Sequence, residues 1–375
     1  MGRKSDPVIE VTTLENYRRR HAQYKSDQDA QLMHAAMPMI AVWDDHEVAN
    51  DSYRDGAANH DPSSEGSYEV RKAAAIQAYH EWMPIRTGPS KEIIYRSFDF
   101  GALLSLHMLD TRLVGRDKAG EYTNIPDVFS PTRTMLGTDQ FNWLDAKLTD
   151  SPGQWQILGQ QVLMARMEIP VSILQFLGPE GATDLPGMLA AVTAYLTAKG
   201  TPAGERTPEQ QDLLDPTKNP MFGYNLDAWD GYPIERELLL TSVYNQLLGT
   251  GRELVVLAGD THNAWHADIT TGGYLPGGLA ADTKIGTMLA TSSVSSPGFE
   301  EYLAGVSADL VASIFTGIIN DLKWMDASQR GFLMLTVTSA EIKADWVFVT
   351  SVFEKAFTSD IGNSATLPFV GALFT

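Results

Sequence analysis

The sequence predicts an α/β protein whose β-sheets are covered by helices. Four apolar runs of strand length end abruptly in polar residues, at 39–43, 103–109, 155–163 and 253–258. Longer stretches with apolar residues at helical spacing separate them. Nearly continuous apolar strands that alternate with helices are typical of sheets covered on both faces. Polar residues just beyond the strand ends are then the first place to look for chemistry.

The helices and hairpins follow from local patterns. Helices are expected at 12–24, with Thr13 as N-cap and Glu15 in the first turn, and at 68–82, 138–148, 186–198 and 304–322. Alternating residues predict hairpins from 93–100 with 102–109 and from 332–338 with 342–350. Loops are expected at 51–67, 200–221 and 270–278. With no evident linker, we expect one domain over residues 1–375 with a loop insertion at 200–221.

Composition narrows the possible functions. The 375 residues contain no cysteine and carry a formal charge of −19, which argues against a nucleic-acid surface or an anionic-membrane surface. Any metal must therefore be held without thiolates, and a surplus of carboxylates suits hard cations. No apolar stretch is long enough to cross a bilayer. Residues 1–10 lack the apolar segment of a signal peptide, and a fold that opens on a polar helix is expected to lack what precedes it.

The strongest candidate site is the sequence WDDHE at 43–47, with Asn50 and Asp51 close behind. Three carboxylates and an imidazole directly after an apolar run would be costly in a core unless a cation or hydrogen bonds compensated them. Such a cluster can direct oxygens at a metal and leave His46 free for the substrate. The structural alternative is a capped helix start, which explains one or two acids but hardly all of them.

A second candidate is the sequence GDTHN at 259–263, which follows the apolar run ELVVLA. In extended backbone, side chains two positions apart point the same way, so Asp260 and His262 would face one point in space. His266 is interpreted as a packing residue. Asp110 and Arg112 are expected to form a structural ion pair, and Gln161 is a candidate oxygen ligand.

The loop sequence NLDAWDGY at 225–232 has two open readings. Its aromatic residues either form the wall of a substrate cleft or simply pack in the core.

Taken in order, these segments resemble the PhoD-like alkaline phosphatases of the calcineurin-like metallophosphoesterase superfamily. WDDHE followed shortly by Asn, paired in order with Gly-Asp-x-His, carries the resemblance, together with the segments EWMPIR, LDTR and NLDAWDGY. The resemblance implies a metallophosphoesterase-like sandwich of two mixed β-sheets flanked by helices. It also implies that Asp45, Asn50, Asp260 and His262 bind metal and that His46 contacts the scissile phosphate or its leaving oxygen.

The resemblance further implies calcium and iron as cofactors. In the family, a Cys and a Gly-Asp-x-x-Tyr motif supply iron ligands from an upstream segment, and this chain contains neither. We therefore expect a fold that is N-terminally incomplete, and a site that binds calcium alone or binds metal poorly. Export from the cytoplasm is a further expectation from the family.

The expected function is hydrolysis of a small-molecule phosphate monoester by a metal-activated water. One alternative keeps the chemistry and takes a diester, as a phosphodiesterase or phospholipase does. The alternative from another class is a catalytically impaired, calcium-binding remnant. An amidohydrolase is disfavoured because such sites usually need more histidines than these clusters contain.

Overall fold

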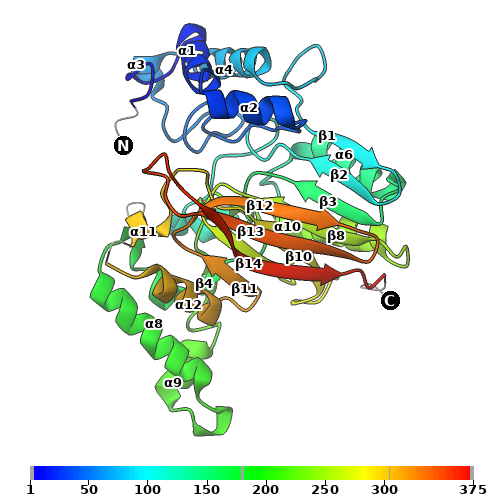
Figure 1. The fold of residues 1–375 in the computed structure, drawn as a ribbon. Helices are drawn as coiled ribbons and strands as arrows, with labels where there is room; N and C mark the ends of the chain where they lie inside the picture. Colours follow the sequence, from blue (N-terminus) through cyan, green and yellow to red (C-terminus); the bar gives the residue numbers. More distant parts are fainter. Residues whose placement is uncertain (1–3, 179–180, 304, 372–375) are drawn as a thin grey trace.

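The computed structural model describes residues 4–178, 181–303 and 305–371. Two β-sheets form its centre (Figure 1). The larger sheet has seven strands in the order β1-β2-β3-β8-β10-β9-β11, and the smaller is the antiparallel sheet β12-β13-β14. Apolar side chains from both sheets, including Trp155, Val255 and Trp346, form one buried cluster between them. The predicted α/β sandwich is thus confirmed, with a smaller sheet that is antiparallel throughout.

The seven-stranded sheet is mixed, and its parallel part positions the polar loops. It contains β1 (Arg96–Phe100), β2 (Leu104–Met108), β3 (Trp155–Gly159), β8 (Glu253–Ala258), β9 (Ala264–Thr270), β10 (Lys284–Ala290) and β11 (Leu322–Asp326). Strands β2, β3, β8 and β10 run parallel to one another. Their carboxyl ends therefore meet at one edge, where the residues that follow each strand come together.

Helices cover the other face of the large sheet. This layer contains α6 (Gly137–Asp150), α10 (Pro233–Leu247) and α12 (Ala308–Ile318), and α8 (Leu185–Gly200) packs against α12. Their buried residues, for example Leu144, Leu240 and Phe315, share the largest apolar cluster with Val256 and Met288 of the sheet. None of the helices within the described ranges combines the length and apolar character needed to span a membrane.

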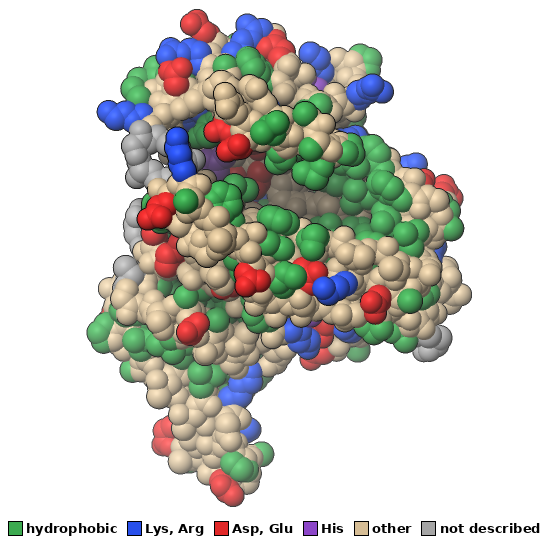
Figure 2. Space-filling view, in the orientation of Figure 1, with side chains coloured by type: hydrophobic (Ala, Val, Ile, Leu, Met, Phe, Trp, Pro, Cys, Tyr) green, Lys and Arg blue, Asp and Glu red, His purple; other side chains and the backbone are tan. Residues whose placement is uncertain are grey.

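A second group of helices lies above the sheets in Figure 1. It consists of α1 (Leu14–Lys25), α2 (Gln28–Ala36), α3 (Pro62–Glu65) and α4 (Tyr68–Trp82). Its core contains Tyr17, Tyr79 and Trp43, and Ile94 and Leu113 join this core to the rest of the chain. Figure 2 shows a hollow between this helical part and the sheets, with apolar side chains along it.

Most predicted elements are confirmed. Thr13 caps α1, α4 coincides with its predicted range, and β12 (Arg330–Val337) pairs with β13 (Glu341–Val349) as a hairpin, with β14 (Ser359–Pro368) alongside. The remaining short elements are α5 (Ile125–Val128), β4 (Glu168–Pro170), α7 (Val171–Leu174), β5 (Leu177–Gly178), β6 (Gly181–Ala182), α9 (Pro208–Leu214), β7 (Met221–Gly223), α11 (Phe299–Tyr302) and the 3-10 turns Tyr122–Asn124, Ala203–Glu205 and Trp229–Gly231. Residue 304, the start of one predicted helix, lies outside the described residues.

Three predictions were wrong, and the first is the loop at 51–67, which contains the short helix α3. Residues 39–43 are not a strand in the structure, because side chains rather than a neighbouring strand bond their backbone. Arg96 donates to the carbonyl of Ala41 at 2.5 Å, and Gln161 donates to that of Trp43 at 2.7 Å. The segment 200–221 is not only loop, because Thr207 starts α9 through a reciprocal capping pair with Gln210.

Candidate active site

The predicted site residues line one cavity of about 810 Å³ at the carboxyl ends of the parallel strands. One wall comes from the loop at 44–51 and the opposite wall from the loop that follows β8. The lining includes Asp44, Asp45, His46, Asn50, Asp51, Asn225, Asp227, Asp260 and His262. The two sequence clusters, more than two hundred positions apart, therefore meet in space as the prediction required.

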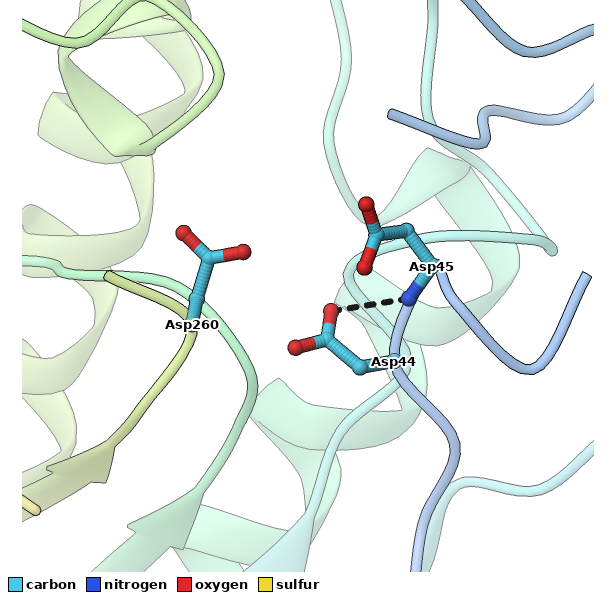
Figure 3. Close-up of side chains that lie close together, drawn as sticks. All are labelled: Asp44, Asp45 and Asp260. Carbon is cyan, nitrogen blue, oxygen red and sulfur yellow. Dashed lines mark hydrogen bonds between the residues drawn. The ribbon is translucent and has the colours of Figure 1, made fainter. Parts of the chain in front are cut away.

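Three carboxylates approach one another across this cavity (Figure 3). Oxygen atoms of Asp44, Asp45 and Asp260 lie within 4.8 Å of one another. Asp45 and Asp260 were predicted from the sequence, whereas Asp44 was not selected as a ligand. His262 and Asn50 line the same cavity, and among the described residues His262 is not part of this closest group.

The loop at 44–51 is a tight turn that the acidic side chains themselves hold in shape. Asp45 accepts from the backbone N–H of His46 at 2.8 Å and of Asp51 at 2.7 Å. Glu47 accepts from the backbone N–H of Asp44 at 2.5 Å. No helix begins at this turn, so the capped helix start considered as the structural alternative is not what the structure shows. Burial raises the pKa of Glu47 to about 7, so this group is only partly ionised at neutral pH.

His46 projects from this turn with 71% of its side chain exposed. Its Nε2 atom lies 3.1 Å from Oδ1 of Asn50. Because an amide oxygen can only accept, this contact places a proton on Nε2. The imidazole is therefore held by Asn50 at the cavity wall, where it is accessible to a ligand.

The loop after β8 has an unusual backbone. Asp260 and His262 have φ values of 68° and 63°, in the left-handed region that non-glycine residues rarely adopt. The expectation that extended backbone aims the two side chains together was wrong, although both reach the cavity. Such strain is usual where a site needs a fixed side-chain geometry.

The tautomer of His262 is set by a backbone carbonyl. Its Nδ1 donates to the carbonyl oxygen of Pro297 at 2.7 Å. The proton therefore stays on Nδ1, and Nε2 is the basic nitrogen. Metal-binding histidines are usually held in this way, with the second ring nitrogen donating to a carbonyl or carboxylate.

Arg112 is the centre of the buried electrostatic network. Its fully buried guanidinium pairs through Nε with Asp44 at 2.7 Å, through Nη1 with Asp227 at 2.6 Å, and through Nη2 with Asp260. Burial acts to lower the pKa of Arg112, but Asp227, Asp44 and Asp260 outweigh it and raise that pKa well above its ordinary value. Arg112 thus ties the two loops of the site together.

The expected ion pair between Asp110 and Arg112 is not formed. Asp110 instead accepts from the backbone N–H groups of Arg112 and Leu113, both at 2.8 Å, and from the indole of Trp43 at 2.9 Å. Asp110 thus stabilises the backbone at the end of the strand, while the guanidinium of Arg112 pairs with acids that are far away in the sequence. The LDTR segment at 109–112 marks Asp110 and Arg112 as a polar pair at a strand end. The sequence does not reveal which acids Arg112 pairs with.

The structure also decides three softer predictions. Gln161 is not an available oxygen ligand, because its Oε1 accepts from the backbone N–H and hydroxyl of Thr111. Trp229 and Tyr232 are buried, so these aromatic residues pack in the core and do not line the cavity. His266 packs beside Trp346, as the sequence indicated.

The charge balance of the network favours a cation. Two guanidiniums face four carboxylates, so the cluster holds an excess of negative charge: Arg112 and Arg116 against Asp44, Asp45, Asp227 and Asp260. Burial raises the pKa of Asp260 well above its ordinary value, and Asp44 and Asp227 add to the rise. Such a cluster is stable when it takes up a proton or a metal ion.

The donor chemistry can be tested against the implied metals. Carboxylate oxygens, the amide of Asn50 and the basic nitrogen of His262 surround the cavity. Oxygen-rich sets of this kind suit calcium. For iron, the chain supplies no thiolate because it contains no cysteine. The residues present therefore fit calcium and do not reproduce the iron site that the resemblance implies.

Comparisons with known proteins identify the family of the chain. The sequence model of a family described as PhoD-like phosphatase matches residues 1–346. Alkaline phosphatase D of Bacillus subtilis (strain 168) is 30% identical over 357 residues, which cover 92% of this chain and 50% of that protein. A solved structure described as "Structure of PhoD" superposes with a TM-score of 0.67 at 25% identity, covering 96% of this chain and 58% of that chain. The chain thus spans about half the length of the curated relative it matches.

Proposed function

Because this chain belongs to the PhoD-like phosphatase family, we propose that it hydrolyses phosphate esters, and monoesters in particular, in the cavity between its two acidic loops. The observation that carries the proposal is the convergence of Asp45 and Asp260 on one point. Negative charge on the attacking water and on the phosphoryl oxygens must be neutralised in the transition state of phosphoryl transfer. A cation bound by the carboxylate cluster would supply the positive charge that does this.

We propose that Asp45, Asn50, Asp260 and His262 hold the cation, with Asp44 beside them. Calcium matches these donors best. A bound cation there would lower the pKa of an attacking water and neutralise the charge of the phosphoryl oxygens. The protein contributes a preformed set of ligands, since Arg112 and the carbonyl of Pro297 fix Asp260 and His262 before any ligand arrives.

His46 is proposed as the general acid. It is exposed at the cavity wall and carries a proton on Nε2 that its contact with Asn50 keeps in place. When a phosphate ester is bound, His46 in its imidazolium form would pass this proton to the departing alkoxide oxygen and become a neutral imidazole that keeps its proton on Nδ1. Proton transfer by a positioned imidazole typically contributes on the order of 10²–10⁴ in rate. Arg112 is a positioning residue, because it contacts the carboxylates and is itself fully buried.

The test is hydrolysis of an aryl phosphate in the presence of calcium, compared between the chain and its His262→Ala variant. We expect turnover by the unmodified chain and its loss in the variant. Equal turnover in the two proteins would remove the assignment. Rates on aryl mono- and diesters separate a monoesterase from a diesterase. Calcium-dependent melting without hydrolysis of either ester would instead identify a calcium-binding protein.

A further inference from the structure

A second cavity of about 500 Å³ adjoins the proposed active site. It lies between helix α1 and the turn at 46–50. Three residues, His46, Glu47 and Asn50, line both cavities. His46, the proposed proton donor, therefore stands at the boundary between them. A group that leaves the phosphorus atom on the side of His46 would enter this second cavity.

The second cavity contains basic side chains that lack acidic partners. Arg20 donates to the backbone carbonyls of Asp6 at 3.3 Å and Pro7 at 2.8 Å, and Nζ of Lys25 lies 2.6 Å from Nε2 of His34. Over the described part of the chain, neither Arg20 nor Lys25 is within ion-pair distance of a carboxylate. This is unexpected in a chain with a formal charge of −19, where acids are in large excess.

The acids that line the same cavity are already engaged. Glu10 pairs with Arg71, and Arg71 also pairs with Glu65 at 3.0 Å. Glu47 accepts from the backbone N–H of Asp44 at 2.5 Å. Burial also lowers the pKa of Lys25, as expected for a cation that has lost water and gained no carboxylate. The cavity therefore has uncompensated positive charge.

The remaining wall is aromatic and apolar, so the cavity also offers a surface for an organic group. Tyr17, Tyr24, His21 and Met83 contribute to it. The ring of His21 stacks on Trp82 with an interplanar angle of 5°. In Figure 2, basic and histidine side chains appear at one end of the hollow beneath the upper helices.

We propose that this second cavity binds the leaving group of the ester and selects leaving groups that carry their own anionic group, a carboxylate or a second phosphate. Arg20 and Lys25 are the specificity-determining residues. The inference rests on the proposed phosphatase function and deepens it, because it names the class of ester that the site prefers. An anion near two uncompensated cations is favoured, and in a partly desolvated cavity this preference is larger than in bulk water.

The test compares butyl phosphate with the phosphate ester of 4-hydroxybutanoate and with butane-1,4-diyl bisphosphate. We expect kcat/KM to be on the order of tenfold higher for the two esters with an additional anion. Lys25→Gln and Arg20→Gln should each bring this ratio toward one, and Lys25→Arg should retain it. Arg19→Gln is the matched control, because it removes the same charge from the same helix outside the cavity, and it should keep the ratio.

The outcomes distinguish a phosphate group from a carboxylate as the anion in the second cavity. They also distinguish failure of this inference from failure of the proposed phosphatase function. A preference for the bisphosphate alone assigns a phosphate group to the cavity, and a preference for both esters assigns any anion. A ratio of one in the unmodified chain, or a ratio that neither Gln variant changes, overturns the inference. If no ester is hydrolysed, the phosphatase proposal fails, and calorimetric binding of 4-carboxybutylphosphonate against butylphosphonate decides this inference by itself. Equal binding, or none, then overturns it.

Discussion

Two buried arginine–carboxylate networks in this protein differ in their surroundings. Arg112 pairs with three carboxylates beside a cavity of about 810 Å³. Arg236 is also buried, but it donates mainly to the carbonyls of Met164 at 2.6 Å and Thr270 at 2.9 Å. The space beside Arg236, which Asp230 also lines, has a volume of about 10 Å³. That is room for one water at most.

The comparison shows that buried charge alone does not mark a functional site. Both regions contain strongly perturbed groups. Burial, with Glu168 nearby, raises the pKa of Asp230 to about 7, and burial raises the pKa of Asp260 well above its ordinary value. Only the region around Arg112 combines an excess of carboxylates with space for a ligand. We therefore assign chemistry to the Arg112 network and structural support to the Arg236 network.

The largest expected effect separates the two networks by activity. Asp260→Asn should lower kcat/KM for an aryl phosphate by about 10³-fold or more, because it weakens cation binding and charge compensation. Asp230→Asn, the same chemical change in the Arg236 network, should leave kcat/KM within about twofold. Steady-state kinetics at saturating calcium measures both. Equal losses in the two variants would mean that activity merely follows stability.

The second effect concerns stability. Arg112→Met leaves Asp44 and Asp260 without their guanidinium partner, while Asp227 keeps Arg116, and it should lower the free energy of unfolding by about 3–5 kcal/mol. Calcium should raise the melting temperature of this variant more than that of the unmodified chain, because the cation takes over part of the lost compensation.

Arg236→Met is the comparison variant. It mainly leaves two carbonyl groups unpaired and should cost about 1–3 kcal/mol with no calcium dependence. Urea unfolding, with and without a calcium chelator, measures all of these changes. The assignment of the two networks would be reversed if calcium stabilised Arg236→Met more than Arg112→Met.

A smaller effect is a pH dependence that belongs to Asp230. Its folded-state pKa of about 7 lies above the ordinary value of 3.8, so the folded protein binds the proton more tightly than the unfolded chain does. The associated stability is complete below pH 4 and is lost as the pH rises through 7. Between these limits the unmodified chain should lose about 3 kcal/mol relative to Asp230→Asn. Parallel stability curves from pH 4 to 8 would refute this origin.

The smallest expected effect concerns Tyr274, at the edge of the Arg236 network. Tyr274 donates its hydroxyl to Glu168, which in turn lies near Asp230. Tyr274→Phe should cost about 1 kcal/mol, the usual contribution of one hydrogen bond, without a change in kcat/KM. Thermal melting and aryl phosphate hydrolysis on the same preparation provide the check. A loss of activity here would extend the active site into the region now assigned to structure.

Local patterns were sufficient to predict much of the fold. The strand Glu253–Ala258 and the helix Tyr68–Trp82 follow from continuous apolar residues and from helical periodicity, and both have the predicted bounds. The helix α9 was missed although Thr207 and Gln210 form a recognisable capping pair in the sequence. Residues 39–43 were misjudged because a strand needs a partner, and an apolar run does not reveal whether one is present.

The candidate site was only partly predictable for a similar reason. Asp45, His46, Asp260 and His262 stand in short clusters that their chemistry makes visible. Arg112 pairs with acids that lie 68, 115 and 148 positions away, and no local pattern encodes such contacts. The left-handed backbone at Asp260 and His262 was likewise invisible, because neither position is a glycine.

The ion pairs of Arg112 connect three separate segments of the chain, and this affects when the cavity takes its shape. These contacts are made between residues of the protein, so the cavity is shaped during folding, before a ligand binds. Little ordering entropy then remains to be spent when a ligand enters. A protein built in this way should keep nearly the same backbone whether empty or loaded, and it should recognise its ligand as a rigid receptor does.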